Sequence, residues 1–158
     1  MYFMFDRRVV RYEDIIRNKD ALITYFTKNA DYFSVVVKTR KPYAQRPPIF
    51  HYDQQLQPYI TRYIFDKHDW LVDFLGAENH QIMLVCNCCR GSRNELLQMP
   101  NIFLPEENVE PEDICFYRNK KLLFATISHE EIAFMVEPSK EDLEFLAKNS
   151  IWISSMAR

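Results

Sequence analysis

The chain has 158 residues and a mass of 19.0 kDa, which fits one compact domain. Hydrophobic residues make up 47% and charged residues 27%, so the chain can bury a core, which excludes a disordered or fibrous protein. The net charge is −2, and residues 1–79 hold 12 basic against 10 acidic side chains, too small an excess for a nucleic-acid surface. No apolar run approaches the roughly 20 residues that span a bilayer, and the first residues lack a basic n-region, so we expect a cytoplasmic protein.

The first half of the chain predicts two helices separated by a strand and a loop. Apolar residues with helical spacing predict a helix over residues 13–28. Residues 32–38 are β-branched and aromatic, as in a mostly buried strand, and residues 38–48 hold four cations and three prolines, which favours an exposed loop. Helical spacing resumes at Pro58, a residue that suits a first helical position, and predicts one helix over residues 58–75.

The middle of the chain predicts a strand, a short helix and a loop. Residues 80–88 are apolar enough for a second buried strand. The sequence Ser92-Arg93-Asn94-Glu95 has the pattern of a capping box and opens a helix that we expect to end near Gln98. Residues 99–113 hold five acids and three prolines, which indicates a solvated loop.

The last third carries the clearest strand pattern. Residues 114–118 and 121–127 flank the turn Asn119-Lys120 and predict a hairpin, and residues 131–136 add a third antiparallel strand. Ser139 then caps a final helix, after which the chain is expected to fold back onto the core through Ile151 and Trp152. The complete order predicts an α+β fold, a single domain over residues 1–158 with a mainly antiparallel sheet, a C-terminal three-strand meander and helices packed on the sheet.

One strand-to-helix turn is rich in groups that can do chemistry, namely Cys86, Cys88, Cys89, Arg90, Ser92 and Arg93. A helix N-terminus presents free N–H groups, binds anions and lowers the pKa of a thiol. One hypothesis is therefore a thiol-dependent enzyme or redox sensor, with Cys88 or Cys89 as nucleophile and Arg90, Ser92 and Arg93 binding an oxyanion. The passage from a strand through cysteine to a loop and a helix resembles low-molecular-weight tyrosine phosphatases, whose phosphate loop has five residues between Cys and Arg. Here Cys86 has three residues before Arg90 and six before Arg93, and Cys88 has one and four, so no pair matches that spacing.

The same cysteines allow two other interpretations. A structural zinc site would draw its ligands from Cys86, Cys88, Cys89, Cys115 and His80. The compressed Cys-x-Cys-Cys spacing differs from that of zinc knuckles, and free cysteines are among the most buried residue types. We therefore favour reduced thiols that pack in strands and in a tight turn, and we expect no metal and no cofactor.

Other candidate residues lie in loops and turns. His129 stands at the predicted hairpin tip beside Glu130 and is a candidate acid or base, but consecutive strand residues point to opposite faces and do not converge. Two loops of opposite charge form a pattern typical of protein docking surfaces. Their candidate contact residues are Arg40, Lys41, Tyr43 and Arg46 in the basic loop and Glu106 and Glu107 in the acidic one.

Aromatic residues reach 15% of the chain, and aromatic rings with arginine dominate the energetics of protein interfaces. With only two glycines, neither a glycine-rich phosphate cradle nor a hydrolase elbow is available. We therefore predict a small non-enzymatic protein-interaction module, a regulator or inhibitor of another protein. Its expected partner is another protein or a second copy of the chain, and neither nucleic acid nor a membrane.

Overall fold

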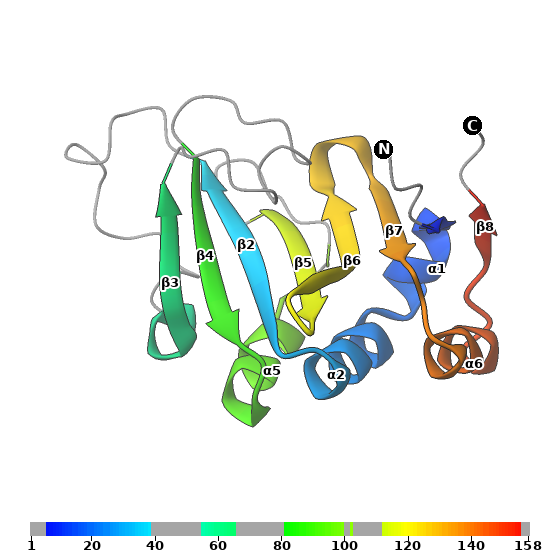
Figure 1. The fold of residues 1–158 in the computed structure, drawn as a ribbon, viewed down its shortest axis with the longest axis horizontal. Coiled ribbons are helices and arrows are strands. Elements are labelled where there is room, and N and C mark those ends of the chain that lie inside the picture. The colour runs from blue at the N-terminus through cyan, green and yellow to red at the C-terminus, as the bar shows by residue number, and fades with distance from the viewer. Residues whose placement is uncertain (1–5, 39–54, 66–80, 100–101, 103–111, 156–158) are drawn as a thin grey trace.

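The computed structural model describes residues 6–38, 55–65, 81–99, 102 and 112–155. Within them, eight strands form one antiparallel sheet in the order β3-β4-β2-β5-β6-β7-β1-β8 (Figure 1). The strands are β1 (Arg7–Val10), β2 (Tyr32–Lys38), β3 (Ile60–Phe65), β4 (Gln81–Asn87), β5 (Glu112–Arg118), β6 (Lys121–Ile127), β7 (Ile132–Val136) and β8 (Ile153–Ser155). The α-helices are α1 (Tyr12–Arg17), α2 (Lys19–Asn29), α5 (Arg90–Leu97) and α6 (Lys140–Lys148), and 3-10 turns form over Gln57–Tyr59 (η2) and Ser128–Glu130 (η3). The predicted α+β class is confirmed.

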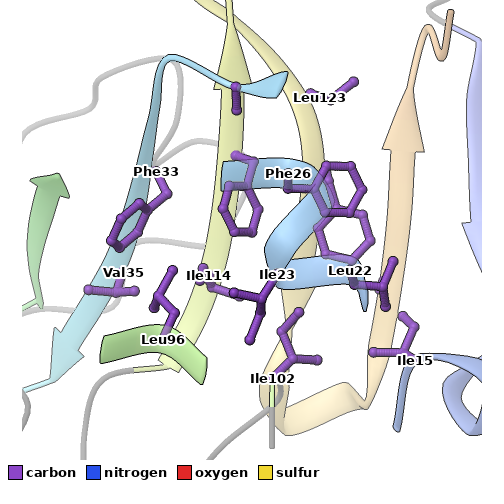
Figure 2. Close-up of a cluster of buried hydrophobic side chains, with 14 of the residues drawn as sticks. Ile15, Leu22, Ile23, Phe26, Phe33, Val35, Leu96, Ile102, Ile114 and Leu123 are labelled. Atoms are coloured by element: carbon purple, nitrogen blue, oxygen red, sulfur yellow. The ribbon is translucent and has the colours of Figure 1, made fainter. Parts of the chain in front are cut away.

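The main core lies between the helices and one face of the sheet. Helix α2 supplies Leu22, Ile23 and Phe26, which pack on strand residues such as Phe33 and Ile114 (Figure 2). The ring of Phe26 stacks on Phe116 and Phe124 of the central strands, with centroids 5.3 and 4.6 Å away. Aromatic rings bury a large apolar area each, so this stack accounts for part of the unusual phenylalanine content.

The opposite face of the sheet also buries apolar side chains. They form a second cluster made of Val36, Ile64, Met83, Val85, Cys115, Tyr117, Ala125 and Phe134. The hydroxyls of Ser34 and Tyr117 hydrogen-bond to each other at 2.8 Å within this layer, which satisfies two buried polar groups. Burial on both faces explains why the central strands are continuously apolar rather than alternating.

The C-terminal meander follows the prediction closely. Strands β5, β6 and β7 are neighbours in the sheet, and the turn residues Asn119 and Lys120 both have positive φ, at 51° and 62°. Helix α6 begins after Ser139, whose hydroxyl accepts from the backbone N–H of Asp142, while the Asp142 carboxylate accepts from the backbone N–H of Ser139. These elements depend on local pairing and capping, which sequence spacing records well.

Two predicted elements differ from the structure, and two strands were not predicted. The helix expected over residues 13–28 is two helices, because Asn18 ends α1 with its side-chain amide on the carbonyl of Asp14 and also precedes α2. The helix expected over residues 58–75 is wrong for residues 60–65, which form β3 beside β4. Those residues are largely β-branched or aromatic, so strand pairing outweighed helical spacing. Residues 66–75 lie outside the described part, and strands β1 and β8 were not predicted.

None of the helices in the described part of the chain is long and apolar enough to cross a membrane.

Candidate functional site

The cysteine-rich turn joins β4 to α5. The helix starts at Arg90, two residues before the predicted cap, and Cys89 is its N-cap residue. The backbone N–H of Ser92 donates to the Cys89 sulfur, while the Ser92 hydroxyl accepts from the Cys89 N–H at 3.0 Å and donates to the carbonyl of Asn87 at 2.7 Å. The expected cap at Ser92 is therefore corrected to Cys89, because the sulfur takes the place that a serine oxygen usually occupies.

The two adjacent cysteines of this turn differ in reactivity. Cys89 is exposed, and hydrogen bonds from the Ser92 backbone and side chain lower the pKa of its thiol. Cys88 packs partly against the main core, where burial and the nearby Asp31 carboxylate raise the pKa of its thiol to about 12. Because the thiolate is the nucleophile, Cys89 is the reactive member of the pair.

The other oxyanion candidates do not all point to Cys89. Arg93 directs its Nε to the hydroxyl of Thr27 on α2 at 2.8 Å, so this guanidinium also joins α5 to α2. Ser92 is fully buried and its hydroxyl serves the turn, whereas Arg90 is exposed. At Gly91 the phenol ring of Tyr59 packs directly on the backbone, so a Cβ at this position would force the Tyr59 ring to shift.

The remaining metal and acid–base candidates are separated in the structure. Cys86 lies in the main core and Cys115 in the cluster on the opposite face, so the sheet stands between them. Burial raises the pKa of Cys115 to about 12. Among the residues that the structure describes, no three His, Cys, Asp or Glu side chains group as metal ligands. His80 lies outside the described residues, as does the side chain of His129.

The candidate contact residues of both predicted charged loops lie outside the described residues, namely Arg40, Lys41, Tyr43, Arg46, Glu106 and Glu107. The ends of the loops do not: Lys38 belongs to β2, and Glu112 and Asp113 belong to β5, where Asp113 is buried and hydrogen-bonded to Ser128, so the solvated loop expected to Asp113 is wrong there.

The segment after α6 forms a surface that was not predicted. Ile151 is buried as expected, but Trp152 is 68% exposed, so its predicted packing onto the core is wrong. Its backbone is nevertheless held at both ends of the residue: the Trp152 N–H donates to Oδ2 of Asp14 at 2.8 Å, and its carbonyl accepts from the N–H of Arg11 at 3.3 Å. The indole therefore projects from a fixed backbone.

Asp14 is the centre of this arrangement, which we call the Asp14 clamp (Asp14, Arg11, Arg17 and Trp152). Its carboxylate is fully buried, and its Oδ1 lies 2.6 Å from Arg17 and 3.6 Å from Arg11. Both arginine side chains are 58% exposed, and the neighbouring Ile16 is 40% exposed. One carboxylate therefore holds the backbone of Trp152 and two partly exposed guanidinium groups.

A second buried carboxylate, Asp142, differs from Asp14 because it joins elements of the packed interior. It accepts from Tyr25 of α2 at 2.6 Å and from both terminal nitrogens of Arg118 of β5 at 2.6 and 3.1 Å. Burial alone would raise the pKa of Asp142, but the bonds from Arg118 and Tyr25 and the Ser139 cap lower it to about 2. The ring of Tyr25 also stacks on Phe145 with centroids 3.9 Å apart, which fixes α6 against α2.

Comparison with known proteins yields no relative. No family model matches the chain, and neither the curated proteins nor the solved structures contain a match.

Proposed function

We propose that this protein is a protein-interaction module and that the surface formed by the Asp14 clamp and Ile16 docks its partner. The observation that supports this is the exposed indole of Trp152 on a backbone held by a buried carboxylate. Tryptophan and arginine are among the residues most enriched at interface hot spots, and here Asp14 binds the backbone of Trp152 and two arginine side chains. Burying such a large ring at an interface recovers the free energy that its exposure to water costs.

The fixed backbone favours binding as well. A side chain that is already placed loses less conformational entropy when a partner immobilises it. Two hydrogen bonds at Trp152 and the ion pairs of Asp14 supply this placement without covering the indole.

The residues around the backbone of Trp152 indicate what the partner must offer. Arg11 and Arg17 share the buried Asp14, and the exposed Glu13 lies 3.6 Å from Arg11, so two cations are matched by two carboxylates. The exposed indole is therefore the feature that a partner would recognise, and a complementary partner offers an apolar pocket for it. We assign this surface to a partner protein with such a pocket.

The proposal is tested by comparing wild-type protein with Trp152→Ala and with Lys140→Ala, an exposed control on α6 that is 90% accessible. Each is immobilised and exposed to lysate, and captured proteins are quantified by mass spectrometry. A partner that the wild type and the control capture equally, and that Trp152→Ala loses, is then purified and its affinity measured. Indistinguishable captures by all three proteins would overturn the proposal.

A second candidate function rests on a different observation, the exposed Cys89 thiol at the start of α5. Its lowered pKa and its contrast with Cys88 favour a thiol-dependent enzyme or redox sensor. In this candidate Cys89 is the nucleophile and the N-terminal N–H groups of α5 stabilise its thiolate.

Iodoacetamide labelling at neutral pH, mapped by peptide, tests this second candidate. Cys89 is expected to label much faster than Cys88, and Cys89→Ser removes the fast phase. Ser92→Ala is expected to slow the labelling of Cys89, because it removes the hydroxyl contribution to the lowered pKa. Equal and slow labelling of Cys88 and Cys89 would exclude a reactive thiol here.

A further inference from the structure

The surroundings of the Cys89 sulfur depend on the first turn of α5. The sulfur accepts from the backbone N–H groups of Gly91 and Ser92, and the Ser92 hydroxyl lies 3.5 Å from it. Because these donors belong to one helical turn, the orientation of that turn decides how they meet the sulfur. A contact made with the turn from elsewhere in the fold can therefore control the thiol.

Tyr59 of η2 makes such a contact. Its phenol ring packs on the backbone of Gly91, and an ideal Cβ on Gly91 would lie 2.7 Å from both Cε1 and Cζ of the ring. Carbon atoms that are not bonded to each other approach best at about 3.5–4.0 Å. The ring therefore rests directly on the helix backbone.

The ring of Tyr59 is itself held by the core and by the sheet. Leu56, three residues earlier, is buried in the main core, and Tyr59 packs against the same cluster. Ile60, the next residue, pairs with Cys86 of β4. Because β3 and β4 are antiparallel, the residue before Ile60 lies toward the end of β4, where the chain turns into α5.

From these contacts we infer that Tyr59 is a positioning residue for the Cys89 thiol: its ring holds the first turn of α5 in the orientation in which the backbone N–H groups face the sulfur. This inference rests on the second candidate function, the reactive thiol, and adds the residue that controls it. Hydrogen bonds to a charged group stabilise its charged form, and donors that are already oriented do so without reorganisation. Tyr59 acts on the thiolate through the backbone of Gly91.

The test measures iodoacetamide labelling of Cys89 in the full chain as a function of pH, mapped by peptide. Tyr59→Ala removes the ring, so the midpoint of the pH profile is expected to move to higher pH and labelling at neutral pH to slow about threefold. Tyr59→Phe keeps the ring and is expected to label as the wild type does. Tyr63→Ala is the matched control, since this tyrosine lies in the adjoining β3 and is 46% exposed.

Gly91→Ala perturbs the same contact from the helix side. The added methyl group forces the Tyr59 ring to shift, although alanine favours a helix more than glycine does. A move of the pH profile to higher pH in this variant would therefore come from the contact and not from a weaker helix. The variant also decides the question if urea denaturation shows that Tyr59→Ala does not fold.

The results that contradict the inference are distinct from those that contradict the reactive thiol. An unchanged pH profile in Gly91→Ala, or in folded Tyr59→Ala, overturns the positioning role and leaves the reactive thiol in place. Equal shifts in Tyr59→Ala and Tyr59→Phe, or in Tyr59→Ala and Tyr63→Ala, also overturn it, because the ring contact would then not be the cause. Labelling of wild-type Cys89 no faster than that of Cys88 overturns the second candidate function together with the inference.

Discussion

Asp14 and Asp142 are both fully buried carboxylates with basic partners, yet they have different structural roles. Asp142 receives its bonds from side chains of α2 and β5 and from the backbone that caps α6, so every group it binds belongs to the packed interior or its boundary. Asp14 binds the backbone of Trp152 and leaves the indole in water. The comparison shows that a buried carboxylate can join packed elements, as Asp142 does, or can fix the backbone of an exposed residue, as Asp14 does.

The comparison also separates two kinds of cost. A carboxylate that is taken out of water must recover its lost hydration through well-placed partners, and both aspartates do so. At Asp142 these partners join three elements, α2, β5 and α6. At Asp14 the partners include the backbone of Trp152, whose exposed ring gains no stability from this bond; we propose that the ring serves binding.

The largest expected effect is on the Asp142 side of the comparison. Asp142→Asn removes the charge that pairs with Arg118, so the free energy of unfolding is expected to fall by about 2–4 kcal/mol. Urea denaturation measures this, with Glu141→Gln, an exposed neighbour, as the control. A loss no larger than that of the control would show that Asp142 does not join the helices to the sheet.

The next largest expected effect is a fall in the free energy of unfolding at acid pH. The pKa of Asp142 is about 2 in the folded protein and near its ordinary value of about 3.9 in the unfolded chain. The folded state thus binds the proton more weakly, and the resulting stability is present above about pH 4 and is lost as the pH falls toward 2. The loss is expected to be on the order of 2 kcal/mol. Asp142→Asn should flatten this part of the profile, and an unchanged slope would contradict the assignment.

On the Asp14 side, Asp14→Ala is expected to cost about 1–2 kcal/mol, because Arg17 is largely exposed and water can replace part of its pairing. Its distinctive effect is on Trp152, whose backbone N–H loses its partner. In a Trp70→Phe background Trp152 is the single tryptophan, and its fluorescence anisotropy should fall when Asp14 is replaced. Unchanged anisotropy would mean that other contacts fix the residue.

The smallest expected effect is that of Trp152→Ala on stability. Since the side chain is 68% exposed, the free energy of unfolding is expected to change by no more than about 0.5 kcal/mol. Urea denaturation beside the exposed-site variant Lys140→Ala checks this. A loss of about 2 kcal/mol or more would place the indole in the core and remove the basis of the docking surface.

The sequence predicts local elements well and long-range contacts poorly. The Asn119-Lys120 hairpin and the Ser139 cap were predictable because both depend on residues close in the chain. Strand β3 was not, because its conformation is decided by pairing with β4 from a distant segment. Trp152 was expected inside, and the 138 positions that separate it from Asp14 hide the bond that holds its backbone.

At the cysteine turn, the prediction found the residues but not their arrangement. The capping-box pattern predicted Ser92 as the cap, while in the structure the cap is the sulfur of Cys89, three residues earlier. A cysteine cap is uncommon among N-cap residues, so spacing rules do not anticipate it. The contrast between Cys88 and Cys89 depends on burial, which no adjacent pair of identical residues reveals in sequence.

The most direct test of the docking surface is the affinity of one captured partner for three proteins: the wild type, Trp152→Ala and Asp14→Ala, measured by titration calorimetry. If the clamp presents Trp152 to the partner, Trp152→Ala is expected to lose about 30-fold or more, and Asp14→Ala a smaller amount, about 3- to 10-fold, because the ring is present but no longer held. Equal affinities for all three proteins would contradict the account, since the exposed tryptophan would then play no part in binding.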